Sequence, residues 1–221
     1  GGRRKRPLDL AMAATSPFAR LDGRDRAFAH NLAATALRRL GQIDALIDLA
    51  LERPMPRKAQ SVRDLLRLGI GQLLFLDTPP HAAVTTMVDL AQDRGHGPHK
   101  KLVNAVLRRF AREGRALTEK QDAARLNTPD WLWESWTAAY GEAACRRIAE
   151  AHLSEAPLDI TLKEDATRWA KELDARILPT GNLRQPPGGT VTDLPGFGEG
   201  AWWGQDAAAS LPANRLGDIK G

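Results

Sequence analysis

The stretch VRDLLRLGIGQLLFLDTPP, residues 62–80, determines the fold prediction for the first half of the chain. Its apolar residues recur at steps of three and four, which is the period of one face of an α-helix rather than of a half-buried strand. The dipeptide Pro79-Pro80 ends this helix and begins the next, because proline fits the first turn of a helix but not its interior. The stretch therefore predicts two successive core helices.

The helical period extends on both sides of this stretch, from Asp25 to about Arg115. Residues 25–40 and 42–52 are predicted as two helices that meet near Gly41, although one kinked helix fits the same pattern. Glycines and a proline at 94–98 separate the helix after Pro80 from the next one. This half of the chain is therefore predicted to be a helical bundle.

After Pro157 the pattern changes to short β-like runs among glycines and prolines. Strands are predicted at 158–162, 176–180 and 190–192, with a helix at 166–173. The segment LPGFGEGAWWGQD, residues 194–206, is predicted as a glycine-rich turn, a short strand and the start of a helix. The fold class is therefore mainly α, with a helical bundle followed by a small α+β module.

The composition limits the class of protein. A chain of 221 residues that is 43% hydrophobic can bury a substantial core. It has no apolar run of about 18 residues and no signal-peptide pattern, so we expect a soluble, cytoplasmic protein without a membrane partner. The single cysteine, Cys145, excludes an intrachain disulfide and a cysteine-based zinc cage within this chain.

The charge is unevenly distributed along the chain. Residues 1–115 contain 21 Lys/Arg and 11 Asp/Glu, whereas residues 116–221 contain 11 Lys/Arg and 16 Asp/Glu. The first part is therefore strongly basic and the second is acidic. This asymmetry favours a polyanionic partner for the first part, although charge alone does not identify RNA.

The segment 99–115 concentrates this charge on one predicted helix. It contains six Lys/Arg and one acidic residue, and its apolar residues gather on one side of a helical wheel. The opposite side suits a phosphate backbone, although an ordinary solvated face is the alternative. Arg3 to Arg6 could extend this basic surface. The predicted RNA-binding residues are Lys101, Arg108, Arg109, Arg112, Arg38 and Arg39.

An aromatic helix is predicted to begin at Thr128-Pro129-Asp130, with Thr128 as a hydroxyl cap and the proline in the first helical position. It carries Trp131, Trp133, Trp136 and Tyr140. These rings favour packing of the segment onto the bundle, and a platform for stacking RNA bases is the sharper alternative.

Three other patterns predict no catalytic, cofactor or metal site. His96 and His99 lie in a turn with no further ligand nearby, so no metal is expected. The glycines at 196, 198 and 200 lack the strand and helix of a nucleotide-binding loop. Cys145 lies in a helical pattern without an activating partner, so it is predicted to be a buried structural thiol.

Several short motifs are distributed over nearly the whole chain. They are DRAF at 25–28, LGQID at 40–44, LGIGQLL at 68–74, PPHAA at 79–83, LVNAVLRR at 102–109, LPGF at 194–197 and QD at 205–206. In this order and spacing they resemble the Fmu/Sun family of small-subunit rRNA cytosine-5 methyltransferases.

The resemblance implies an all-helical NusB-like domain over residues 1–140, a helical linker over 141–157 and an RRM-like α+β module over 158–221. In this family the S-adenosylmethionine domain begins just after Ile219-Lys220-Gly221. That domain carries the cofactor loop and two catalytic cysteines. The family's opening helix is missing or shortened here, since residues 7–10 resemble the segment after it.

The resemblance thus implies a substrate-recognition region that binds small-subunit rRNA and does not methylate it alone, because cofactor and nucleophile belong to the parent enzyme. Two alternatives remain. One is a NusB-type transcription antitermination protein, which does not explain the residues after the bundle. The other is a protein-docking scaffold, whose binding would be insensitive to salt. The oligomeric state is not predicted.

Overall fold

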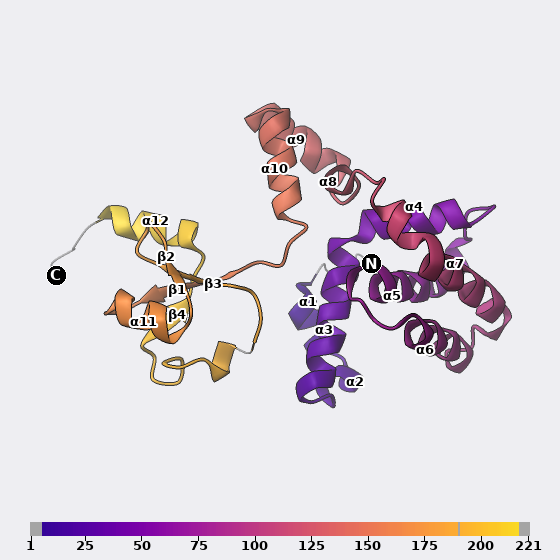
Figure 1. Ribbon diagram of the computed structural model, residues 1–221, viewed down its shortest axis with the longest axis horizontal. Helices are drawn as coiled ribbons and strands as arrows, with labels where there is room; N and C mark the ends of the chain where they lie inside the picture. The colour runs from indigo at the N-terminus through magenta and orange to yellow at the C-terminus, as the bar shows by residue number, and fades with distance from the viewer. Residues whose placement is uncertain (1–5, 190, 217–221) are drawn as a thin grey trace. The chain divides into compact units, whose positions relative to one another are not determined.

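The computed structural model describes residues 6–189 and 191–216, and the chain divides into two compact units, residues 1–153 and 154–221 (Figure 1). Arg3, Arg4 and Lys5 of the predicted basic surface, and the chain end at 217–221, lie outside the described residues. The first unit contains α1 (Leu8–Ala13), α2 (Ser16–Ala19), α3 (Gly23–Arg38), α4 (Leu40–Ala50), η1 (Arg57–Ala59), α5 (Gln60–Phe75), α6 (Pro80–Asp93), η2 (Gly97–His99), α7 (Lys100–Thr118), α8 (Ala123–Leu126), α9 (Asp130–Tyr140) and α10 (Glu142–Ala151).

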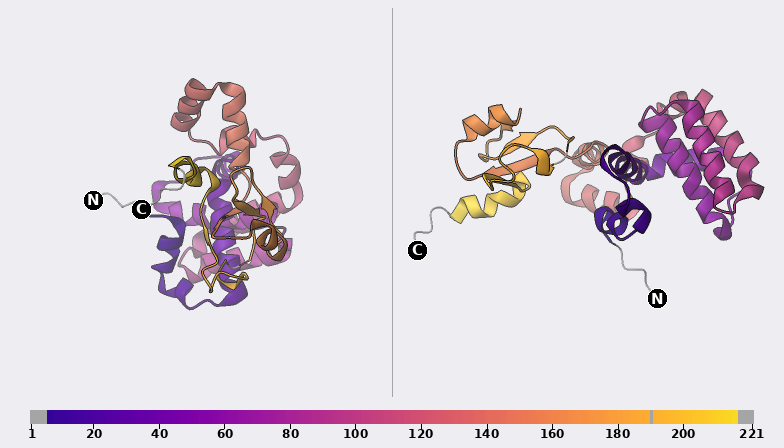
Figure 2. Two further views of the ribbon diagram at one scale, coloured as in Figure 1. Left: turned by 90° about the vertical axis from the view of Figure 1, so that its left-hand side faces the viewer. Right: turned by 90° about the horizontal axis from the view of Figure 1, so that it is seen from below.

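The helix predicted from residues 62–80 is α5, the central helix of the bundle. It packs against α3, α4, α6 and α7, and α6 and α7 lie alongside it (Figure 2). Pro80 is the first residue of α6, as predicted, and Pro79 precedes it as the N-cap. The predicted turn near 94–98 lies between α6 and α7 and includes η2. The helical bundle is confirmed.

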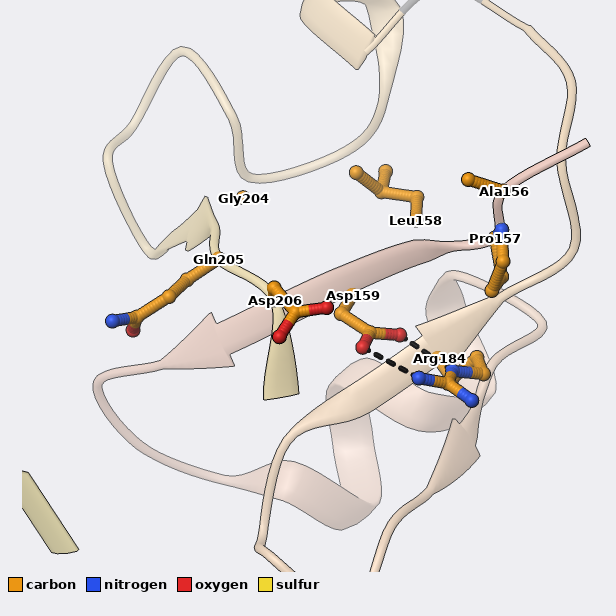
Figure 3. Close-up of a pocket in the computed structure, with 8 residues that line it drawn as sticks. All are labelled: Ala156, Pro157, Leu158, Asp159, Arg184, Gly204, Gln205 and Asp206. Atoms are coloured by element: carbon orange, nitrogen blue, oxygen red, sulfur yellow. Dashed lines mark hydrogen bonds and ion pairs between the residues drawn. The ribbon is translucent and has the colours of Figure 1, made fainter. Parts of the chain in front are cut away.

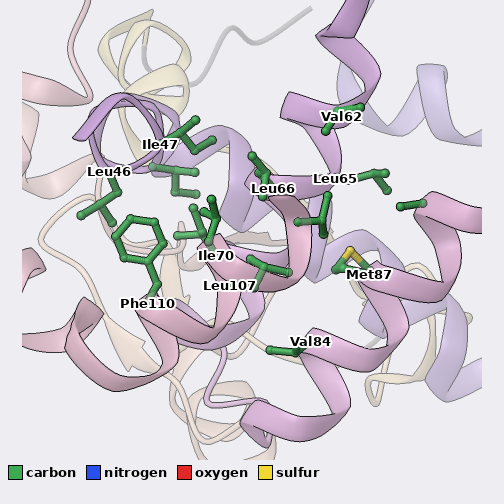
Figure 4. Packing of buried hydrophobic residues seen from close by; sticks show 14 residues of the cluster. Leu46, Ile47, Val62, Leu65, Leu66, Ile70, Val84, Met87, Leu107 and Phe110 are labelled. Atoms are coloured by element: carbon green, nitrogen blue, oxygen red, sulfur yellow. The ribbon is translucent and has the colours of Figure 1, made fainter. Parts of the chain in front are cut away.

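The bundle core forms where the apolar faces of α4, α5, α6 and α7 meet (Figure 4). Leu66 and Ile70 of α5 and Leu107 and Phe110 of α7 are fully buried. Burying a side chain of this size stabilises the folded state by about 1.5–3 kcal/mol. The burial fixes the rotation of α7, so the face of α7 opposite to this core must point outward.

The α3–α4 junction has two helices rather than one kinked helix, with Arg39 between them. Gln42 is buried beside it, and its backbone N–H donates to Asn127 Oδ1 at 3.1 Å. The side-chain amide of Gln42 also donates from Nε2 to Gln121 Oε1 at 3.2 Å, and its Oε1 accepts from Asn127 Nδ2 at 2.9 Å. These bonds join α4 to the residues on either side of α8, so the LGQID motif has a structural role.

A cluster of ion pairs joins α4 to α5. Asp44 accepts hydrogen bonds from Arg63 Nε at 3.0 Å and from Arg67 Nε and NH2 at 2.8 and 2.7 Å. Burial by itself would raise the pKa of Asp44, but the hydrogen bonds and charges of Arg67 and Arg63 hold it below its ordinary value. The carboxylate is therefore ionised at neutral pH and fixes the two helices relative to one another.

The aromatic helix α9 differs from its prediction in two respects. Its N-cap is Pro129, and the Thr128 hydroxyl donates instead to the Ala124 carbonyl at 2.8 Å, so the predicted hydroxyl cap was wrong. The helix packs against α10, and among its rings Trp131 is 69% exposed and Tyr140 is 63% exposed. The prediction that these rings pack the segment onto the bundle therefore does not hold for Trp131 and Tyr140.

The second unit contains β1 (Leu158–Leu162), α11 (Ala166–Glu172), β2 (Arg176–Ile177), β3 (Leu183–Gln185), η3 (Val191–Asp193), β4 (Trp202–Gly204) and α12 (Ala207–Leu216). Its four strands form an antiparallel sheet in the order β2-β3-β1-β4. This is the order of a split βαβ fold, with β3 inserted between β1 and β2. The α+β prediction is confirmed.

Two details of this sheet were not predicted correctly. The segment predicted as a strand at 190–192 falls on Thr190, outside the described residues, and on η3, which is a 3-10 helix. Strand β3 was missed. Between β3 and β4, the described residues form η3 and a glycine-rich loop rather than an α-helix.

The two faces of the sheet have different chemistry. One buries Ile160 and Leu183 together with Trp169 of α11 and Trp202 of β4. The other is polar and contacts α12, whose Ser210 hydroxyl donates to Asn182 Oδ1 at 2.8 Å. Alternation along β1 produces this division, since successive side chains of a strand point to opposite faces.

Asp159 is the central polar residue of the second face. Its carboxylate accepts hydrogen bonds from Arg184 Nε and NH2 at 2.6 and 2.7 Å and from the Ala207 backbone N–H at 3.0 Å. The hydrogen bond from Arg184 lowers the pKa of Asp159, and burial, which would raise it, is outweighed. This carboxylate therefore links β1, β3 and the start of α12.

We expect Asp159→Asn to destabilise the second unit by about 2–3 kcal/mol at neutral pH, because it leaves a partly buried guanidinium without its carboxylate. A lowered folded pKa contributes stability that is complete above the ordinary aspartate pKa of about 3.9 and is lost as pH falls through the folded value. Urea unfolding at several pH values measures both effects. If the free energy of unfolding of the variant fell at low pH as much as that of the wild type, this role for Asp159 would be contradicted.

Candidate nucleic-acid interface

Helix α7 carries four of the six basic residues that the sequence singled out. Its buried side consists of Val103, Val106, Leu107 and Phe110, and these residues pack into the bundle core. Lys101, Arg108 and Arg112 are exposed and lie within about 20° of one line along the opposite side, at roughly 100° per residue. The structure thus brings these three predicted residues together on one surface, which we call the α7 basic line.

The arginines of the α7 basic line have polar neighbours on the same helix, and the Arg112 guanidinium also lies 3.8 Å from Glu113 Oε1. Arg108 Nε donates to Asn104 Oδ1 at 3.0 Å, and Arg112 NH1 donates to the Arg108 carbonyl at 3.2 Å. Arg109 lies about 80° from Lys101 around the helix and donates to Glu113 Oε2 at 3.3 Å. Arg109 therefore lies beside the line rather than on it.

Arg115 also lies near this line and was not singled out from the sequence. It is three residues beyond Arg112 and is 78% exposed. Its NH2 donates to Asp77 Oδ1, 3.0 Å away in the α5–α6 turn. The helical wheel could have identified Arg115, since it lies seven residues after Arg108, but the contact with Asp77 could not be read from the sequence.

Arg38 is the last residue of α3 and Arg39 follows it, so neither belongs to α7. Arg39 donates to Gln42 Oε1 and to the Leu153 carbonyl, both at 3.1 Å, and its guanidinium lies 5.2 Å from the centre of the Phe75 ring. Burial, together with the charge of Arg38, lowers the pKa of Arg39. Arg39 would have to give up these contacts to bind an external phosphate.

The aromatic alternative rests on α9. Trp133 lies under the guanidinium groups of Arg125 and Arg146, at 5.3 and 5.5 Å from its ring centre. These arginines pair in turn with Asp130 and Asp122. Trp133 is therefore a structural contact between helices, whereas the exposed Trp131 has the access that base stacking requires.

The other polar patterns form no catalytic arrangement. Cys145 is fully buried and its thiol lies 3.6 Å from the Trp133 carbonyl, as expected for a structural thiol. The loop with glycines 196, 198 and 200 precedes β4, and the next helix begins only at Ala207, so it lacks the helix N-terminus of a nucleotide-binding loop. Within residues 6–189 and 191–216, no group of three His, Cys, Asp or Glu is placed to hold a metal ion.

A pocket of about 500 Å³ lies beside Asp159 in the second unit (Figure 3). Figure 3 shows Asp159 and Arg184 facing one another, with Asp206 beside them. Asp206 accepts hydrogen bonds from the backbone N–H groups of Ala208 and Ala209 at the start of α12. The charged groups of this pocket thus bond within the module.

None of the helices in the described part of the chain is long and apolar enough to cross a membrane. Residues 3–112 match the NusB family model. The chain is 32% identical over 210 residues to a probable ribosomal RNA small subunit methyltransferase B from Synechocystis sp., covering 87% of this chain and 47% of that protein. It is 31% identical over 204 residues to the ribosomal RNA small subunit methyltransferase B of Shigella boydii, covering 86% of this chain and 47% of that protein.

The chain therefore spans about half the length of these relatives. The aligned residues extend well beyond the NusB match, since 210 residues cannot be accommodated within 3–112. These two findings agree with the motifs at 25–109 and 194–206. The chain thus carries a NusB-family domain and is homologous, over most of its length, to the N-terminal half of the small-subunit ribosomal RNA methyltransferase B proteins.

Proposed function

We propose that this chain is the RNA-recognition region of an S-adenosylmethionine-dependent small-subunit rRNA (cytosine-5) methyltransferase. The observation that carries the proposal is the α7 basic line, in which Lys101, Arg108 and Arg112 are exposed together on one helix face. Lysine and arginine side chains neutralise phosphates and release counterions, which supplies affinity for RNA without reading its sequence.

The packing of α7 supports this role. The buried contact of α7 with the bundle core fixes which face of the helix is turned outward, and that face carries the three cations. Arg109 and Arg39 are proposed as secondary contacts, because their present partners compete with an RNA phosphate. Arg38 is also proposed as a secondary contact, because its side chain is half-buried. The resemblance is also the basis for proposing a NusB-like domain over residues 1–140, a helical linker over 141–157 and an α+β module over 158–221.

The methyl transfer is proposed for the whole enzyme rather than for this chain. S-adenosylmethionine would supply the methyl group when bound to the parent protein. The only cysteine here, Cys145, is buried in α10 and cannot reach a cytosine ring. The chain's own residues would bind and orient the rRNA.

A transcription antitermination protein is the main rival, since it would share the NusB domain. The similarity to the methyltransferase B proteins covers 87% of the chain and therefore includes part of the second unit, which favours the enzyme instead. A protein-docking role would use the apolar groove of about 290 Å³ beside Leu37, Leu40 and Leu68. Binding through that groove would be insensitive to salt.

The proposal is tested with a fluorescein-labelled fragment of small-subunit rRNA and the full 221-residue chain. Fluorescence anisotropy measures the Kd of the wild type and of the Lys101/Arg108/Arg112→Ala variant. We expect the variant to bind about thirtyfold or more weakly, since each phosphate contact contributes a charge-assisted hydrogen bond.

The matched control is Arg147/Lys163/Lys171→Ala, which removes the same number of positive charges from exposed positions outside α7. We expect its Kd to stay within about threefold of the wild type, because exposed charges that do not contact the RNA directly are screened by salt. Equal losses in the two variants would show that RNA responds to net charge and would contradict a specific role for α7.

A further inference from the structure

The α5–α6 turn places a carboxylate against the end of the α7 basic line. Asp77 follows α5 with a φ of 48°, which lies in the left-handed region. In this position its Oδ1 accepts a hydrogen bond from Arg115 NH2 at 3.0 Å. Both side chains are exposed, Arg115 at 78% and Asp77 at 84%.

We infer that Arg115 is a fourth phosphate contact on α7 and that Asp77 competes with the RNA backbone for its guanidinium. The inference rests on the proposed function and extends it to a residue and a competing group that the sequence did not indicate. It specifies the ligand as the phosphodiester backbone of RNA, bound without reading the bases.

The length of the line supports a backbone ligand. Lys101, Arg108, Arg112 and Arg115 are separated by seven, four and three residues, which at about 1.5 Å per residue spans about 21 Å. Between them the exposed surface of α7 carries the small residues Ala105 and Ala111 rather than an aromatic ring. Such a surface can contact phosphates but has no platform for stacking bases.

The chemistry of the Asp77–Arg115 pair supports competition. An ion pair between two exposed side chains is weak, because water screens it and both side chains lose rotational freedom. A phosphate can accept two parallel hydrogen bonds from one guanidinium, which gives it an advantage over a single contact with Asp77. RNA would therefore displace the carboxylate, and that displacement lowers the affinity of the wild type.

The test compares Arg115→Ala, Asp77→Asn and the double variant of the full chain. Asparagine also adopts the left-handed region readily, so Asp77→Asn preserves the turn while removing the charge. The readout is the Kd for a fluorescein-labelled RNA hairpin, measured by anisotropy over a series of salt concentrations. Near-UV circular dichroism checks that each variant is folded.

We expect Arg115→Ala to weaken binding about three- to tenfold and to reduce the salt slope by about 0.7–0.9, the value for one lost phosphate contact. We expect Asp77→Asn to tighten binding about two- to fivefold, which corresponds to the loss of one exposed ion pair. In the Arg115→Ala background, Asp77→Asn should have no effect, because Asp77 would then have no guanidinium to occupy.

Asp89→Asn is the control, since it removes the same charge from an exposed position on α6. Equal tightening by Asp89→Asn, or tightening by Asp77→Asn without Arg115, would reveal a long-range charge effect and overturn the competition. If Arg115→Ala binds like the wild type while Lys101/Arg108/Arg112→Ala binds weakly, the inference fails and the proposed function stands. If the wild type fails to bind RNA even at low salt, both fail.

Discussion

Replacing Gly41 by alanine is expected to destabilise the first unit by about 3 kcal/mol, because there is no space for the added methyl group. A Cβ at Gly41 would lie 1.7 Å from the Leu126 carbonyl oxygen and 2.5 Å from its carbon. Both are backbone atoms, so a side-chain rotation cannot relieve the overlap. The residues around α8 would have to move away from α4 and would lose the hydrogen bonds between Gln42 and Asn127.

Gly71→Ala is the matched control for this prediction. Gly71 also lies in a helix, but its Cβ would meet Leu32 and Ala36 at 3.7 and 3.9 Å, which is ordinary contact. Alanine is favoured over glycine in a helix by about 0.5–1 kcal/mol, so this variant should be neutral or more stable. Urea unfolding gives both free energies, and hydrogen exchange of residues 121–128 locates the loss. A Gly41→Ala protein as stable as Gly71→Ala would contradict the close approach of α4 to Leu126.

Replacing Gly196 by alanine is expected to destabilise the second unit by about 3 kcal/mol or more, for two reasons that add. Gly196 has a φ of 81°, which an L-residue with a side chain rarely adopts. In addition, its Cβ would lie 2.3 Å from Cη2 of the Trp169 indole, which is buried in the module core. The LPGF motif therefore needs its glycine for packing.

Gly181→Ala separates the two causes. Gly181 has a similar φ of 85°, but a Cβ there meets nothing within 4 Å. The Gly181→Ala variant should lose only the stability that the left-handed backbone conformation costs an alanine, roughly 1–2 kcal/mol of the free energy of unfolding. Hydrogen exchange of strand β1, measured by mass spectrometry, reports the stability of this unit separately. Equal losses in the two variants would show that the Trp169 contact contributes nothing.

The helices whose apolar residues recur regularly were predictable from the sequence, but the contacts between these helices were not. The step of three and four residues at 62–80 located α5 and the start of α6. The same pattern placed a helix boundary near Gly41, but it could not show why glycine stands there. The reason is a contact with residues about 85 positions further on, such as the bond from Gln42 to Asn127.

Short elements gave too little pattern to predict. Strand β3 has three residues, too few to display alternation, and it is identified only by its pairing with β1 and β2. Val191 and Thr192 are β-branched and favour strands, yet they lie in a 3-10 helix between glycine-rich segments. Local propensity was outweighed there by the path the chain takes from β3 to β4.

The candidate site was predictable in part for the same reason. Lys101, Arg108 and Arg112 belong to a helix with a clear apolar face, so the wheel indicated their common exposure. Glu113 follows Arg109 by four residues, so the sequence could have indicated that pair. It could not show that Asp77, in the turn between α5 and α6, pairs with Arg115. It also could not show that Arg39 is held by Phe75 and the Leu153 carbonyl.

The central claim is that RNA phosphates lie along α7, and the salt dependence of binding tests it most directly. The measurement is the slope of log Kobs against log salt concentration for the wild type and for Lys101/Arg108/Arg112→Ala, with the same rRNA fragment. We expect a slope that is shallower by about 2–3 in the variant, since each of the three lost phosphate contacts removes about 0.7–0.9. Equal slopes in the two proteins would contradict it, because the RNA would then be bound by other residues.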